Sequence, residues 1–158
     1  MEELMLFTDG SVNTLSRIGY GAYLAISERG LSLDSLRSHV QVKRFENTSS
    51  TKLELQTVLW ALSEIQTLGK RVIIYTDSQN IIRLRGRRER FEKNDYHSKK
   101  NRRLNNYELY QEFFRMTDLL DCEFISVRGH KASHQKDEID ALFTLVDRAS
   151  RNALREDR

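Results

Sequence analysis

The stretch MLFTDGSV, residues Met5 to Val12, sets an apolar run directly before an Asp-Gly pair. A second stretch, RVIIYTDSQN from Arg71 to Asn80, repeats the design, with VIIY followed by Thr-Asp. Such runs predict buried β-strands, and each carboxylate falls where its strand is expected to reach solvent. A carboxylate at that place either forms a turn or binds a cation. These two strands therefore bear on both the fold and the candidate site.

Hydrophobic periodicity divides the rest of the chain into further strands and helices. A helical pattern begins near Ser50, where Ser49 or Ser50 can cap it. The expected strands are 4–7, 20–27, 39–46, 72–75 and 123–127, and the expected helices are 50–68, 78–85, 104–120 and 138–154. We predict an α/β fold with a mixed five-stranded sheet, in which the first three strands form an antiparallel meander and helices pack on the sheet.

Length and composition favour one globular domain over residues 1–158, with 39% hydrophobic and 31% charged residues. The single cysteine, Cys122, excludes an intramolecular disulfide and fits a reducing compartment. The sequence contains neither a signal peptide nor the roughly 20 apolar residues of a membrane helix. We therefore expect a cytoplasmic protein with no membrane partner.

Charge is concentrated in one segment. Ten basic and three acidic residues lie between Arg83 and Arg103, so this segment carries +7 while the whole chain carries +3. A basic patch on an otherwise acidic body indicates a polyanionic partner, although a solvated helix face gives the same pattern. Phe91 and Tyr96 within the segment can either stack on nucleotides or anchor it.

Four carboxylates are candidates for one site. Asp9 and Asp77 would lie about 5 Å apart if their strands are neighbours. Glu54 stands between Leu53 and Leu55 in the first turn of a helix, and Asp147 lies within an apolar helical stripe. Turn and cap chemistry explains either aspartate alone. As a set with no evident internal cation, the four acids predict Mg²⁺ ligands, and two such ions would serve phosphodiester hydrolysis.

Six motifs in order resemble those of type 1 ribonuclease H. They are TDGS (8–11), GYGAYL (19–24), KLELQTVLWAL (52–62), YTDSQ (75–79), VRGH (127–130) and VDRASRNAL (146–154). The resemblance implies a ribonuclease H-like fold with helices on both faces of the sheet. It also implies endonucleolytic cleavage of the RNA strand of RNA/DNA hybrids, which leaves 5′-phosphate and 3′-hydroxyl ends. The implied cofactor is a pair of Mg²⁺ ions, with Mn²⁺ as a substitute.

The resemblance assigns roles residue by residue. Asp9, Glu54, Asp77 and Asp147 would be catalytic metal ligands, and His130 would assist proton movement or product departure. Asp140, ten residues after His130, is the alternative to Asp147, because its spacing needs no insertion. We choose Asp147 for its local match to D-x-x-small-R.

The resemblance also implies how the hybrid is held, by a chain that acts as a monomer without a protein partner. The basic segment, at about 83–105, would be a protrusion that binds phosphates of the DNA strand. RNA 2′-hydroxyls would be contacted near Asp9 and near the start of the helix that carries Glu54. The expected substrate-binding residues are Gly10, Ser11, Asn13, Ser50, Thr51, Arg87, Arg88, Lys99, Lys100 and Asn106.

Two other functions stay open. A non-catalytic nucleic-acid-binding module could keep the same fold, but binding phosphates gains nothing from extra carboxylates. A related metal-dependent exonuclease is the other alternative. Such enzymes usually carry Asp-x-Glu on the first strand, whereas Gly10-Ser11 follows Asp9 here.

Overall fold

The computed structural model describes residues 2–28, 30–65, 69–127 and 137–157. Its centre is a five-stranded sheet in the order β3-β2-β1-β4-β5. The strands are β1 (Glu3–Asn13), β2 (Ile18–Ile26), β3 (Gln41–Phe45), β4 (Arg71–Thr76) and β5 (Asp121–Ser126). The first three strands are antiparallel neighbours, and β4 is parallel to both β1 and β5. The predicted mixed sheet is therefore confirmed.

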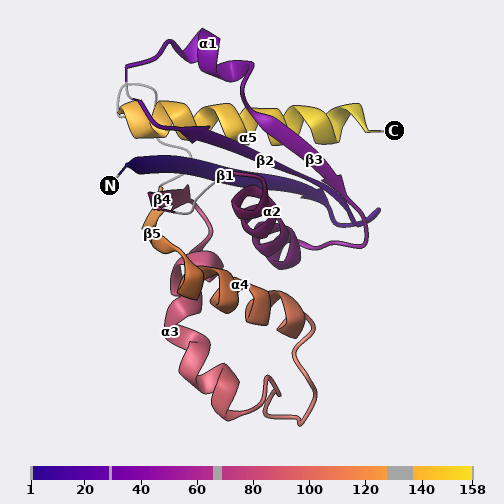
Figure 1. Cartoon of the computed structure of the whole chain (residues 1–158). Coiled ribbons are helices and arrows are strands. Elements are labelled where there is room, and N and C mark those ends of the chain that lie inside the picture. The colour runs from indigo at the N-terminus through magenta and orange to yellow at the C-terminus, as the bar shows by residue number, and fades with distance from the viewer. Residues whose placement is uncertain (1, 29, 66–68, 128–136, 158) are drawn as a thin grey trace.

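Helices cover both faces of the sheet (Figure 1). They are α1 (Leu33–Arg37), α2 (Ser50–Glu64), α3 (Gln79–Lys93), α4 (Tyr107–Leu119) and α5 (Glu138–Glu156). The long helix α5 lies along one face, and α2, α3 and α4 lie on the other. None of the helices in the described part of the chain is long and apolar enough to cross a membrane.

Alternating side chains of the central strands feed two hydrophobic cores. Phe7 on β1 points to the α5 face, where it packs with Leu142 and Val146. Its neighbour Leu6 points the other way and packs with Val58 on α2. Because both faces are covered, residues Leu4 to Thr8 are buried without a break, as the continuous apolar run predicted.

Several elements differ from the sequence prediction, and among them α2 ends at Glu64 instead of continuing to residue 68, because Ile65 is already extended. The strand β1 does not end at Asp9 but continues to Asn13, because β2 pairs with it along this whole length. The helix α3 runs to Lys93 instead of ending near Arg85. The short helix α1, which no periodicity indicated, is capped by the Ser32 hydroxyl and buries only Leu36.

The basic segment is anchored by its aromatic residues. Tyr96 is 7% exposed, and Phe91 lies between it and Tyr110, with ring centroids 6.0 and 5.0 Å away. The Tyr96 carbonyl accepts a backbone hydrogen bond from Leu104 at 2.7 Å. Of the two roles left open for these aromatic side chains, the structure supports anchoring, and the segment is held to the main core.

Candidate active site

Asp9 and Asp77 meet at one edge of the sheet because β1 and β4 run parallel. The ladder between these strands pairs Phe7 with Tyr75, so each aspartate follows two residues further along its chain. The strand β4 ends at Thr76, whereas β1 continues beside β2. Asp9 is therefore partly buried, and Asp77 is exposed where the sheet opens to solvent.

The helix α2 brings Glu54 to the same place. Its first turn is fixed by the Ser49 hydroxyl, which accepts a hydrogen bond from the Lys52 backbone N–H at 3.3 Å. Glu54 is hydrogen-bonded to Ser78 and interacts electrostatically with the negative charge of Asp77. Ser78 is itself the N-cap of α3, with its hydroxyl 3.1 Å from the Ile81 backbone nitrogen. One buried serine thus joins the helix acid to the end of β4.

Two glycines let α2 approach the sheet this closely. Gly10 and Gly21 face each other across β1 and β2. A Cβ atom on Gly10 would lie 2.8 Å from Leu53 Cδ2, and one on Gly21 would lie 2.3 Å from Thr57 Oγ1. A larger residue at Gly21 would therefore push against the buried Thr57 and displace α2, and Glu54 with it, whereas one at Gly10 would force the buried Leu53 side chain to move.

The helix α5 supplies the fourth carboxylate. Asp147 lies within hydrogen-bonding reach of Asp9. On its other side, Arg151 Nε donates to Asp147 Oδ1 at 2.9 Å, and Arg151 Nη2 lies 2.9 Å from Oδ2. The cation that pairs with Asp147 is thus a half-exposed arginine at the rim of the group rather than an internal one.

The proximity of these acids shifts their protonation. Burial, followed by the negative charge of Asp77, raises the pKa of Asp9 to about 8, and Asp147 adds to the effect. Burial also raises the pKa of Glu54, against the opposing hydrogen bond from Ser78. Asp9 is thus the acid of the group whose pKa is raised by both burial and two neighbouring carboxylates.

Asp9, Glu54 and Asp77 line a small cavity that fits a divalent cation in its chemistry. The cavity is lined by Thr8, Asp9, Gly10, Glu54, Thr57, Thr76, Asp77 and Ser78. Its donors are all oxygen atoms, which hard cations such as Mg²⁺ prefer. Within the described residues, no three acidic, histidine or cysteine side chains are yet close enough to form a ready-made metal site. A divalent cation held by these oxygen atoms would offset the negative charge of Asp77 and Asp147, which adds to the effect of burial on the pKa of Asp9.

The two late aspartates occupy different places. Asp140 is 6% exposed and belongs to the capping box of α5, where its side chain accepts a hydrogen bond from the Asp137 backbone N–H at 3.3 Å. It lines a separate hollow with Tyr75 and Ile125. Only Asp147 of the two is in contact with Asp9. His130 lies outside the described residues.

The expected contacts to the RNA strand are spread around the cavity. The Ser11 hydroxyl is 3.1 Å from that of Ser150, so it joins β1 to α5. Asn13 caps the β1–β2 turn by accepting from the Leu15 and Ser16 backbone N–H groups. At the start of α2, Ser50 is exposed and Thr51 partly so.

Some of the residues expected to contact phosphates are already bonded to other side chains, and others have no ion pair with a described residue. Arg88 is held by Asp118, with both nitrogen–oxygen contacts at 2.8 Å or less, and by Glu92. Arg87 donates to the Asn80 side chain at 3.0 Å. Lys99 and Lys100 are exposed and have no ion pair with any described residue. The remaining predicted residue, Asn106, is the N-cap of α4 and lines a hollow beside Lys52.

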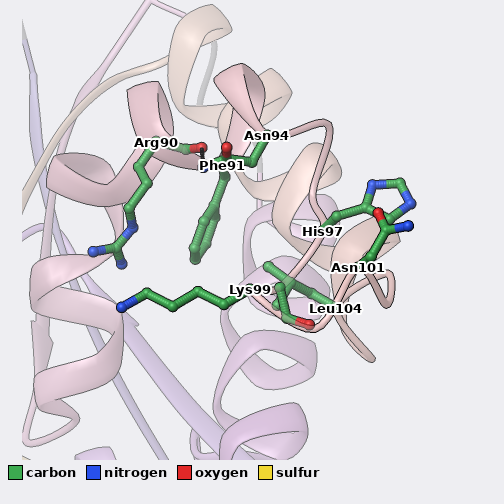
Figure 2. Close-up of a pocket in the computed structure, with 8 residues that line it drawn as sticks. Arg90, Phe91, Asn94, His97, Lys99, Asn101 and Leu104 are labelled. Carbon is green, nitrogen blue, oxygen red and sulfur yellow. Dashed lines mark hydrogen bonds between the residues drawn. The ribbon is translucent and has the colours of Figure 1, made fainter.

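A cavity of about 440 Å³ opens in the basic segment. It is lined by Arg90, Phe91, Asn94, His97, Ser98, Lys99, Asn101 and Leu104, with no acidic residue among them. Figure 2 shows the Arg90 and Lys99 side chains extending to the same side of this cavity, beside the ring of Phe91. The sequence gives no reason to single out Arg90, because ten basic residues between Arg83 and Arg103 do not reveal which of them pair with acids.

The sequence analysis also assigned no role to Ser78 beyond a helix cap, or to Arg151 beyond its place in a motif. The signal for Arg151 was present, since an arginine four residues after an aspartate on a helix forms an ion pair. Nothing in the sequence indicated that Ser78 would bond to Glu54, because that contact depends on how α2 and β4 pack.

The fold and the grouped acids together define the ribonuclease H-like class. Among solved structures, the chain is similar to the PFV RNase H domain, with a TM-score of 0.73 at 14% identity, over 94% of this chain and 92% of that one. It is also similar to LC9-RNase H1, described as a type 1 RNase H with the type 2 active-site motif, with a TM-score of 0.71 at 19% identity, over 96% and 72% of the two chains. At these identities the likeness concerns the fold.

The RNase H family model matches residues 1–149, and the chain belongs to this family. The chain is 26% identical over 142 residues to Ribonuclease H of Neorickettsia sennetsu, which covers 89% of each chain. It is 26% identical over 147 residues to Ribonuclease H of Acetivibrio thermocellus, over 91% of this chain and 94% of the relative. The predicted family is confirmed, and with it the class of metal-dependent nucleases.

Proposed function

We propose that this protein cleaves the RNA strand of RNA/DNA hybrids endonucleolytically, with Asp9, Glu54, Asp77 and Asp147 as ligands of two Mg²⁺ ions. The observation that carries the proposal is the placement of Asp9, partly buried, beside both Asp77 and Asp147: burial, followed by the charge of Asp77, raises its pKa to about 8. Membership of the RNase H family supports the same substrate and reaction. A binding module would have no use for negative charges placed against a polyanion.

Each carboxylate contributes from a different element. Asp9 is central, since it neighbours Asp77 on one side and Asp147 on the other, so it is the residue suited to bridge two ions. Divalent ions at this edge would supply the Lewis acid that activates water and stabilises the departing 3′-oxygen. Ser78 orients Glu54 through its hydrogen bond. His130 stays a proposed proton-handling residue beyond the part of the chain described.

The basic segment would hold the DNA strand. The structure favours Arg90 and Lys99 as phosphate contacts, joined by Lys100, because these cations have no ion pair with a described residue and two of them border one acid-free cavity. Arg88 is a weaker candidate than the sequence suggested, since Asp118 and Glu92 already bind its guanidinium. Gly10, Asn13, Ser50, Thr51 and Asn106 remain proposed contacts.

A substrate panel tests the function. The purified chain is incubated with an RNA/DNA hybrid, duplex RNA, single-stranded RNA and duplex DNA, each with Mg²⁺ or with EDTA. We expect shortening of the RNA strand of the hybrid alone, only with the metal, and with 5′-phosphate and 3′-hydroxyl ends. Asp9→Asn should abolish cleavage while hybrid binding persists. Cleavage by this variant in Mg²⁺ would overturn the site assignment.

A second substrate separates the alternatives. A circular DNA paired with an internal RNA segment offers no end to an exonuclease, so cutting within the RNA requires an endonuclease. Retention of the hybrid without any shortening would instead indicate a binding module. We also propose a monomeric, cytoplasmic protein, and sedimentation of the purified chain tests the first of these.

A further inference from the structure

The ion pair between Arg151 and Asp147 borders the carboxylate group of the proposed site. Both carboxylate oxygens are engaged, Oδ1 by Nε and Oδ2 by Nη2, each at 2.9 Å. The two residues are one helical turn apart, and their side chains are 50% and 26% exposed. A two-pronged contact of this kind fixes the plane of the carboxylate as well as its charge.

This contact bears on how Asp147 can serve a cation. A carboxylate has about four lone-pair positions, and the guanidinium occupies one on each oxygen. The same carboxylate is a neighbour of Asp9. Both oxygen atoms of Asp147 thus already face a guanidinium nitrogen. A cation that binds here has to share Asp147 with a fixed positive charge.

We propose that Arg151 is a positioning residue that holds Asp147 in its metal-free orientation and weakens the affinity of the site for divalent cations. This inference rests on the proposed function, because it takes Asp147 as a metal ligand. As a cation binds, Asp147 turns toward it and its contact with Arg151 loosens. Arg151 therefore sets the divalent-ion concentration at which the site fills.

The backbone around Asp147 supports a movement of its side chain rather than of its helix. Ser150 is completely buried, and its hydroxyl bonds to the Asp147 carbonyl at 3.1 Å and lies 3.1 Å from the Ser11 hydroxyl. Val146 is also completely buried. The helix is thus packed against β1 on both sides of Asp147, so a change in the partners of Asp147 would come from rotation of its side chain and of the half-exposed Arg151 side chain rather than from a shift of the helix.

Calorimetric titration of the full chain with Mg²⁺ alone, and separately with Mn²⁺, tests the proposal without any nucleic acid. Arg151→Gln should tighten binding about two- to fivefold, the range expected for removing a half-exposed ion pair. Arg151→Lys keeps the positive charge but cannot make the two-pronged contact with both carboxylate oxygens, so we expect a smaller increase in Mg²⁺ affinity. Arg148→Gln is the matched control, because Arg148 is exposed, adjacent in sequence, and has no ion pair with a described residue.

A double variant separates positioning from general electrostatics. In an Asp147→Asn background, Arg151→Gln should leave the remaining Mg²⁺ affinity unchanged. The proposal is overturned if Arg151→Gln binds Mg²⁺ as wild type or more weakly, or if Arg148→Gln has an equal effect. Should Arg151→Gln fail to fold, Arg151→Lys decides alone: tighter binding supports the proposal, and unchanged or weaker binding overturns it. Failure of the wild type to cleave the hybrid would instead contradict the proposed function. The two failures can be told apart because the Mg²⁺ titration contains no hybrid.

Discussion

Asp9 and Asp77 stand side by side because each lies two residues beyond the pair formed by Phe7 and Tyr75. The parallel register of β1 and β4 therefore places two acids together that are far apart in sequence. The rings of Phe7 and Tyr75 are stacked, with centroids 4.8 Å apart and planes inclined by 11°. Because this stacked pair belongs to the hydrophobic core, packing of the core helps to fix the distance between the two carboxylates.

The two late aspartates should respond differently to substitution. Asp147→Asn removes a carboxylate that touches Asp9, so we expect at least a hundredfold loss of hybrid cleavage, on the order of other lost electrostatic groups. Asp140→Ala should retain cleavage but lower the free energy of unfolding by about 0.5–2 kcal/mol, because it breaks the capping box of α5. Cleavage assays and urea unfolding measure both. The reverse pattern would make Asp140 the ligand.

Stability of the metal-free protein should fall as pH rises from about 4 to about 8. In the folded chain the pKa of Asp9 is raised to about 8, whereas its ordinary value is 3.8. Between these values the unfolded chain loses a proton that the folded chain retains, so ionisation favours unfolding, and the loss levels off above pH 8. Thermal unfolding in EDTA at several pH values measures it.

Two controls accompany this measurement. Asp9→Asn cannot ionise and should show a flatter dependence on pH over the same window. Addition of Mg²⁺ at pH 8 should restore stability to the wild type by binding the folded state. Equal slopes for the wild type and Asp9→Asn would show that other groups cause the loss.

The glycine contact beneath α2 should be sensitive to a single methyl group. Gly21→Ala would place its Cβ 2.3 Å from Thr57 Oγ1, and Thr57 is fully packed and bonded to the Leu53 carbonyl at 2.7 Å. We expect a loss of about 1–3 kcal/mol in the free energy of unfolding, as for an overpacked core, and a reduced cleavage rate because Glu54 moves.

Gly86→Ala is the matched control for this substitution. Gly86 lies inside α3 with nothing within 4 Å of its would-be Cβ, so alanine should stabilise the protein by about 0.5–1 kcal/mol through helix propensity. Denaturant unfolding of both variants gives the comparison. If Gly21→Ala proved as stable and active as the wild type, the close approach of α2 would not position Glu54.

Cations of the basic segment should separate into binding and structural groups. Arg90→Gln and Lys99→Gln should each weaken hybrid binding and lower the slope of log affinity against log salt by about one, as for a lost phosphate contact. Arg88→Gln should mainly change stability, since its guanidinium is already bound to Asp118 and Glu92. Fluorescence anisotropy over a salt series measures the slopes, and a full unit of slope lost in Arg88→Gln would contradict the division.

The sequence predicted the sheet well, and it indicated where two of the candidate acids lie, because both depend on local pattern. The buried runs around Phe7 and Ile74 alternate with turns, and the acids follow those runs directly. The end of β1 was misplaced because its outer half is held by pairing with β2, which no local pattern reveals. The helix α3 was predicted too short because its later turns bury few residues and rest on contacts such as that of Phe91 with Tyr110.

The partners of charged side chains could not be predicted from the sequence in the same way. Arg88 reaches Asp118 across 30 positions, and Ser78 reaches Glu54 only after two elements pack. The sequence therefore supplied the identity of the candidate ligands, and the packing supplied their surroundings.

The anchoring of the basic segment through Phe91, Tyr96 and Tyr110 has a consequence for where a hybrid is cut. Since these rings belong to the same core that positions the sheet, the span between the Arg90–Lys99 cavity and the acids is set by the fold rather than by a loose tether. The distance along the hybrid between the bound phosphates and the cleaved bond is then constant. Cuts near the end of a hybrid should fall at a constant offset in nucleotides, whatever the base sequence.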